Sequence, residues 1–89
     1  MAPLDSDLSL DGRVAVVAGS GSGLGAAEAV NLARSGAAAV VINDIRAGEA
    51  TDAVIADIEA AGATAELVLG DVSERETADA MCAAALAHG

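Results

Sequence analysis

Residues 14–25 read VAVVAGSGSGLG, and this stretch decides the fold of the chain. An apolar run rich in valine, typical of a buried parallel strand, leads into four glycines within seven residues and then into an alanine-rich segment with helical spacing. Because glycine has no Cβ atom, the backbone can turn sharply there and lie close to a ligand. The amides that open the following helix would face an anion, with the helix dipole adding positive potential. The stretch therefore predicts a cradle for the phosphates of a nucleotide.

Apolar runs and helical segments alternate along the rest of the chain. We expect strands at residues 13–18, 38–43 and 64–70, and helices at 23–35, 47–61 and from a capping box at 73–76 to about residue 87. Such alternation implies parallel strands joined by right-handed crossovers. The sequence therefore predicts a three-layer, Rossmann-type α/β sheet, limited to an N-terminal βαβαβα half, with strand order 3-2-1. The first two helices should cover one face of this sheet and the third helix the other. Residues 1–12 are a lead-in, and residues 13–89 form one partial dinucleotide-binding domain.

The glycines fit two overlapping registers. Gly19, Gly23 and Gly25 give G-x-x-x-G-x-G, whereas Gly21, Gly23 and Ala26 give the G-x-G-x-x-A dinucleotide fingerprint. We prefer the first register, because Gly19 follows the strand directly, where the tight turn must lie. A glycine-rich turn without a ligand is the alternative. A Walker-type loop is excluded, since it needs a lysine and the chain has none.

Acidic residues follow the second and third apolar runs. An acid at the position of Asp44 accepts hydrogen bonds from the adenosine ribose in dinucleotide folds, and it would repel a 2′-phosphate, so NAD is favoured over NADP. Arg46 nearby weakens this inference, and Asn43 takes the position if the strand ends one residue earlier. Asp71 and Val72, after the third run, could contact the edge of an adenine ring. Ordinary turn or capping roles are the alternatives for both acids.

Composition limits the other functions. A net charge of −10 with only four arginines excludes a nucleic-acid partner and disfavours an anionic membrane surface. Cys82 is the single cysteine and the acidic N-terminus does not resemble a signal peptide, so we expect a cytoplasmic protein. We expect Cys82 to be a small core or boundary residue and His88 to be solvated. Neither residue has a partner for a metal site or a nucleophilic dyad.

Four segments in this order resemble the N-terminal part of the short-chain dehydrogenase/reductase family. Residues 10–17 (LDGRVAVV) are similar to its first strand. Residues 18–25 match its T-G-x-x-x-G-[IL]-G loop, with Ala18 in place of the usual threonine. Residues 43–45 (NDI) match its ribose-binding turn, and residues 70–73 (GDVS) match its adenine-side turn. The resemblance spans nearly all of residues 8–89.

The resemblance implies an NAD-dependent oxidoreductase acting on an alcohol or a ketone. The catalytic Ser, Tyr and Lys of the family lie further along than these motifs, and this chain contains no Tyr and no Lys. No catalytic residue is therefore assigned, and we expect no turnover from this chain alone. The cofactor-binding residues that the resemblance implies are Gly19, Ser22, Gly23, Leu24 and Gly25 for the pyrophosphate and adjacent ribose, Asp44 and Ile45 for the adenosine ribose, and Asp71 and Val72 for the adenine.

In a doubly wound sheet a fourth strand pairs with the first, and this chain supplies none. An apolar strand edge without a neighbour favours association. We therefore expect self-association, a completing chain along the first strand, or marginal stability. The leading hypothesis is the nucleotide-binding half of a dehydrogenase, as a fragment or a truncated product. A non-catalytic dinucleotide-binding module or subunit is the alternative. An S-adenosylmethionine-dependent methyltransferase fragment, with glycines at 19, 21 and 23, is a remote one.

Overall fold

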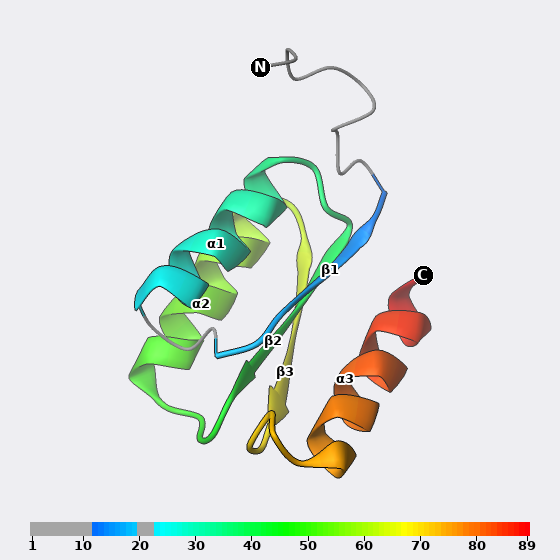
Figure 1. Cartoon of the computed structure of the whole chain (residues 1–89). Coiled ribbons are helices and arrows are strands. Elements are labelled where there is room, and N and C mark those ends of the chain that lie inside the picture. Colours follow the sequence, from blue (N-terminus) through cyan, green and yellow to red (C-terminus); the bar gives the residue numbers. More distant parts are fainter. Residues whose placement is uncertain (1–11, 20–22) are drawn as a thin grey trace, which may run out of the picture.

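A computed structural model describes residues 12–19 and 23–89 of the chain (Figure 1). Its elements alternate as the sequence predicted, and their ends differ from the predicted ones by at most two residues. The lead-in expected at residues 1–12 lies, apart from Gly12, outside the described residues. The elements are β1 (Val14–Val17), α1 (Gly23–Arg34), β2 (Ala39–Asp44), α2 (Glu49–Ala60), β3 (Thr64–Leu69) and α3 (Arg75–His88).

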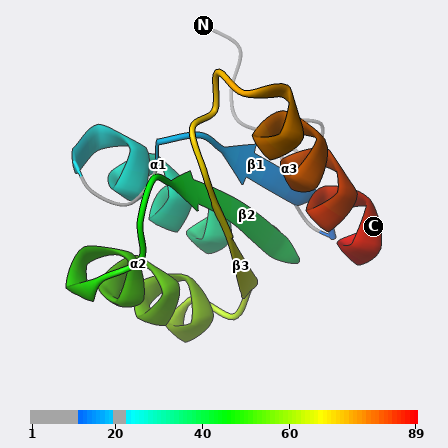
Figure 2. The ribbon, with the colours of Figure 1, turned by 90° about the horizontal axis from the view of Figure 1, so that it is seen from below.

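The three strands form one parallel sheet in the order β1-β2-β3, with β2 in the centre. Val14 pairs with Ala39 in the first ladder, and Ala39 pairs with Thr64 in the second. Helices α1 and α2 cover one face of the sheet, and α3 lies against the opposite face (Figures 1 and 2). The predicted half-Rossmann fold, its strand order and the division of helices between the two faces are confirmed.

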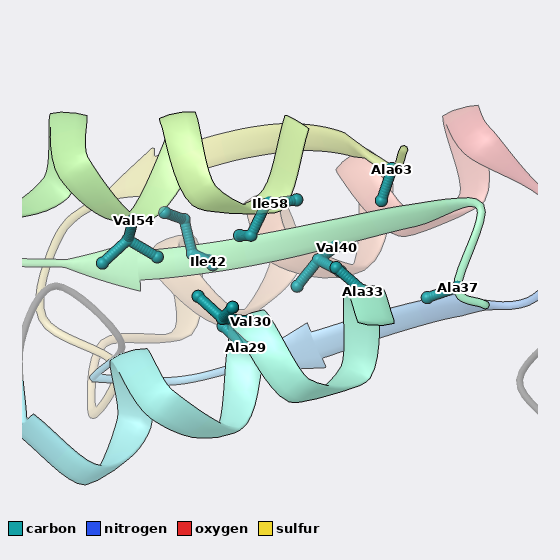
Figure 3. Close-up of a cluster of buried hydrophobic side chains, with 9 residues drawn as sticks. All are labelled: Ala29, Val30, Ala33, Ala37, Val40, Ile42, Val54, Ile58 and Ala63. Atoms are coloured by element: carbon teal, nitrogen blue, oxygen red, sulfur yellow. The ribbon is translucent and has the colours of Figure 1, made fainter. Parts of the chain in front are cut away.

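The main core lies between the sheet and the α1–α2 layer (Figure 3). Val40 and Ile42 of β2 point toward Val30 of α1 and toward Val54 and Ile58 of α2. Burying a branched aliphatic side chain contributes about 1.5–3 kcal/mol, whereas alanine, the commonest residue of this chain, contributes much less. The few larger side chains of this layer therefore carry most of its hydrophobic stabilisation.

Replacing Ile58 with alanine is expected to lower the free energy of unfolding by about 2–5 kcal/mol. The side chain is fully buried, and alanine neighbours in the layer are too short to fill the cavity that it would leave. Urea denaturation followed by circular dichroism measures the loss. Leu86→Ala is the control, because Leu86 is 78% exposed on α3 and should change stability by about 0.5 kcal/mol or less. Equal losses in the two variants would contradict this assignment of the core.

Helix α3 packs on the opposite face through Thr77, Met81 and Ala84, all of which are buried. They recur at helical spacing and face β2 as well as its two neighbours. Cys82 falls outside this stripe and is exposed, so the expected core or boundary position is wrong. In an alanine-rich helix, little in the sequence distinguishes the packed side from the solvated one.

The start of α3 differs from the predicted capping box. The helix begins at Arg75 after Glu74, and no side chain caps it. Instead, the Ser73 hydroxyl donates to Asp71 Oδ1 at 2.7 Å, and the Ser73 amide donates to the same oxygen at 2.9 Å. The capping box is wrong because a carboxylate two residues earlier engages the serine.

His88 is also placed differently from the expectation that solvent surrounds it. Its Nε2 lies 2.6 Å from Oε1 of Glu66, in the middle of β3. This contact fastens the last turn of α3 to the edge strand. None of the helices in the described ranges has the length and apolar character needed to span a membrane.

Candidate dinucleotide site at the carboxyl edge of the sheet

Parallel strands bring their carboxyl ends to one edge, where ligands of open α/β sheets bind. Here the turns after β1, β2 and β3 meet at that edge. The Gly70 amide, just beyond β3, donates to the carbonyl of Asp44 at 2.9 Å. The segments predicted separately for phosphate, ribose and adenine are thus neighbours in space.

The phosphate side lies between β1 and α1. Gly19 follows β1 with φ of 62°, and Gly23 opens α1 with φ of 64°, a conformation that other residues rarely adopt. Gly25 lies in the first turn of α1, which contains no acidic residue that would repel an anion. Ser22, the remaining predicted residue of this loop, lies outside the described residues. The described part of the loop thus turns through a positive φ at Gly19 and again at Gly23.

Asp44 is the last residue of β2 and is partly exposed at the edge. Its Oδ1 accepts a hydrogen bond from the Ile45 amide at 2.6 Å, which orients the carboxylate beside the turn. Asn43, the alternative for this position, is only 2% exposed. Of the two residues, Asp44 is therefore the one that can reach a ligand with its side chain.

Asn43 is a residue of the site whose role the sequence reasoning missed. Its Oδ1 accepts a hydrogen bond from the Gly19 amide at 3.3 Å. Its Nδ2 donates to the carbonyls of Val68 and Gly70, each at 3.0 Å. One buried side chain of β2 therefore bonds to the turn after β1 and to the end of β3. The signal for it in the sequence was an amide side chain at the end of an otherwise apolar buried run.

The adenine-side turn is held by a steric requirement for glycine at position 70 and by hydrogen bonds to Asp71. Gly70 has φ of 139°, and a Cβ atom there would lie 2.4 Å from Thr77 Oγ1, so this position requires glycine. The Asp71 carbonyl accepts a hydrogen bond from the Glu74 amide at 2.9 Å. The amide and hydroxyl of Ser73 together hold the pKa of the Asp71 carboxyl below its usual range. The turn thus presents an ionised carboxylate in a defined position.

Ser73→Ala is expected to raise the pKa of Asp71 toward its usual range, because the variant removes the hydroxyl donor and keeps the amide. Carboxyl ¹³C shifts recorded against pH measure this change. A folded-state pKa below the unfolded one adds stability at higher pH, and that stability is lost as pH falls through the folded pKa. The stability difference between the variant and the wild type should therefore be present near neutral pH and shrink below about pH 4. An unchanged Asp71 titration would contradict the hydrogen-bond assignment.

Apolar side chains stand exposed beside each polar element of this edge. Leu24 is 77% exposed at the start of α1, Ile45 is 68% exposed after β2, and Val72 is 50% exposed after β3.

Other features of the described residues do not compete with this edge. A surface hollow between α1 and α2 is bordered by residues such as Ala26, Arg34 and Asp57, and it includes none of the predicted site residues. Residues 12–19 and 23–89 contain no cluster of His, Cys, Asp and Glu that could hold a metal ion.

Comparison with known proteins points to one family. The profile of the short chain dehydrogenase family matches residues 13–88. Hydroxyacyl-CoA dehydrogenase ChsB1 of Mycobacterium tuberculosis is 48% identical over 84 residues, which is 90% of this chain and 26% of that protein. Versicolorin reductase 1 of Aspergillus parasiticus is 40% identical over 79 residues, which is 89% of this chain and 30% of that protein.

Solved structures agree with the sequence comparison. A 3-oxoacyl-(acyl-carrier-protein) reductase of Agrobacterium tumefaciens C58, crystallised with NADP bound, matches with a TM-score of 0.73 and 40% identity, over 89% of this chain and 30% of that one. A hydroxysteroid dehydrogenase of Escherichia coli matches with a TM-score of 0.78 and 32% identity, over 91% of this chain and 34% of that one. The chain spans about a quarter to a third of the length of these relatives.

Proposed function

Because this chain belongs to the short-chain dehydrogenase/reductase family of oxidoreductases, we propose that its residues 13–89 form a partial NAD-binding domain. Gly19 and Gly23, both with positive φ, carry this proposal. They flank the loop that leads into α1, and the first turn of α1 contains no acidic residue that would repel a phosphate. Family membership removes the methyltransferase alternative. The proposed contacts are Gly19, Ser22, Gly23, Leu24 and Gly25 with the pyrophosphate and adjacent ribose, Asp44 and Ile45 with the adenosine ribose, and Asp71 and Val72 with the adenine.

NAD is the proposed cofactor rather than NADP. The Asp44 carboxylate would accept hydrogen bonds from the ribose hydroxyls and would repel a phosphate on the 2′ oxygen. The solved Agrobacterium reductase holds NADP, so the choice rests on residues of this chain and not on its relatives. When bound, the dinucleotide supplies the hydride acceptor or donor, while the residues named here bind and orient its adenosine diphosphate half.

The complete reaction proposed is hydride transfer between NAD and an alcohol or a ketone, with the chain acting as its dinucleotide-binding half. This chain contains no Tyr and no Lys, the side chains to which the family resemblance assigns proton transfer, so we propose that it does not turn over alone.

Among the described strands β1 pairs with β2 alone, and its other edge suits a strand of a second copy or of a completing chain. The single cysteine favours a reducing compartment, and the proposed location is the cytoplasm.

Calorimetric titration of the 89-residue chain with NAD, and separately with NADP, tests this function. We expect NAD to bind more tightly and to shift the NMR signals of the Gly19, Asp44 and Asp71 amides. Binding of neither dinucleotide would overturn the proposal, and so would shifts confined to residues away from the carboxyl edge. Tighter binding of NADP would overturn the proposed cofactor alone.

A further inference from the structure

Asn43 bonds to two turns that the proposed function assigns to different parts of one ligand. Gly19 opens the phosphate loop, and its amide donates to Asn43 Oδ1. Gly70 precedes the adenine-side Asp71, and its carbonyl accepts a hydrogen bond from Asn43 Nδ2. These partners lie 24 and 27 residues from Asn43 along the chain, in opposite directions.

The chemistry of these partners decides which way the amide points. A backbone N–H only donates and a carbonyl only accepts, so the side-chain oxygen must face Gly19 and the nitrogen must face Val68 and Gly70. The side chain is 2% exposed, and water therefore competes little for these bonds. A buried amide with partners on both sides holds its neighbours at a fixed spacing more firmly than an apolar contact would.

We propose that Asn43 is a positioning residue that couples the phosphate loop to the adenine-side turn. A dinucleotide then meets both turns at one fixed spacing. Without this coupling, binding would have to order each turn separately, and the cost of that ordering would weaken binding. This inference rests on the proposed function. It assigns Asn43 no contact with the ligand, because the neighbouring Asp44 occupies the exposed end of β2.

The test compares Asn43→Ala with Val41→Ala in the full chain. Val41 is fully buried on β2, two residues before Asn43 and thus on the same face of the strand, and it is distant from the turns. Both variants lose core contacts, but only Asn43→Ala removes the amide. Trimethylamine N-oxide, which favours compact states, brings the two variants to equal fractions folded. The measurements are amide hydrogen exchange and carbonyl ¹³C shifts by NMR, and the Kd for NAD.

We expect exchange at the Gly19 amide, which donates to Asn43 Oδ1, to accelerate by about tenfold or more in Asn43→Ala relative to Val41→Ala. The carbonyl ¹³C shifts of Val68 and Gly70, which accept from Asn43 Nδ2, should change in Asn43→Ala and stay near the wild-type values in Val41→Ala. The Kd for NAD should rise by about tenfold in Asn43→Ala and by less than about threefold in Val41→Ala. Equal Gly19 exchange in the two variants, or unchanged Val68 and Gly70 carbonyl shifts in Asn43→Ala, would overturn the coupling. Equal losses of affinity at equal folded fractions would also overturn it, since they would make the role of Asn43 merely structural.

Asn43→Asp gives a second, selective variant. It keeps an oxygen acceptor for the Gly19 amide, but above neutral pH it turns a negative charge toward the carbonyls of Val68 and Gly70. Protection of the Gly19 amide should therefore persist while the carbonyl ¹³C shifts of Val68 and Gly70 change, and loss of protection at Gly19 with unchanged carbonyl shifts would contradict the assigned contacts. If the wild type binds neither dinucleotide while the exchange pattern appears as expected, the proposed function fails and the link between the turns stands.

Discussion

Gly23→Asp is expected to abolish NAD binding while leaving the chain folded. The substitution places a carboxylate at the start of α1, where the proposed site holds the pyrophosphate. Two unit charges about 4 Å apart interact by about 4 kcal/mol at the effective dielectric constant near a protein surface. Since about 1.4 kcal/mol corresponds to a tenfold change in Kd, affinity should fall by at least about a hundredfold. Calorimetric titration measures this loss.

The fold should tolerate this change. A Cβ atom at Gly23 would meet no described neighbour within 4 Å, and aspartate is among the residues that accept a positive φ most readily. A cost of about 1–2 kcal/mol for the left-handed conformation is partly offset by the favourable effect of a negative charge at a helix N-terminus. Thermal unfolding should therefore show at most a modest decrease in stability.

Gly48→Asp is the matched control for Gly23→Asp. Gly48 precedes α2 with an extended backbone, φ of 178°, and a Cβ atom there also meets nothing within 4 Å. The same charge is thus added at the start of the neighbouring helix, outside the proposed contacts. NAD affinity should change by less than about threefold. Equal losses of NAD affinity in Gly23→Asp and Gly48→Asp would indicate an effect of net charge rather than a phosphate site at α1.

Asp44→Ala is expected to remove the proposed preference of the chain for NAD over NADP. The variant loses the proposed charged acceptor of the ribose hydroxyls, an interaction of about 1.5–3 kcal/mol, so NAD affinity should fall by about tenfold to a hundredfold. NADP loses a repulsive charge near its 2′-phosphate and keeps the nearby Arg46, so its affinity should hold or improve. Parallel titrations with the two dinucleotides give the ratio of their dissociation constants.

Asp57→Ala controls for the loss of one negative charge. Asp57 is exposed on α2 and borders the hollow between α1 and α2, away from the carboxyl edge. Its removal should change the affinities for NAD and NADP by similar small factors, and their ratio should stay as in the wild type. If the ratio of the NAD and NADP dissociation constants were equal in Asp44→Ala and Asp57→Ala, Asp44 would not distinguish the ribose hydroxyl from the 2′-phosphate.

The order of elements was predictable because its signals are local. Apolar runs, helical spacing and glycines between them mark each strand and helix within a few residues of the chain. The same locality explains the confirmed sheet order, since short crossovers of one hand leave few other arrangements for three strands. For this reason Gly19 follows β1, Gly23 begins α1 and Asp44 ends β2, as the local pattern indicated.

Predictions that depended on which partner a side chain contacts were wrong at Ser73 and His88. The capping box needed the Ser73 hydroxyl, and the structure engages it with Asp71. His88 was expected to face solvent, but it meets Glu66, which lies 22 residues away along the chain. Cys82 was misplaced because α3 is rich in alanine and carries little amphipathic signal.

The sequence by itself determined that three strands run parallel and that glycines and acids gather at their carboxyl ends, because strand, turn and helix preferences act over a few neighbouring residues. Only the tertiary structure decided that the Asn43 amide joins Gly19 to Gly70 and that Asp44, rather than Asn43, stays exposed. Those outcomes depend on which side chains the parallel register buries. That register brings together residues that are 24 to 27 positions apart, beyond the reach of any local pattern.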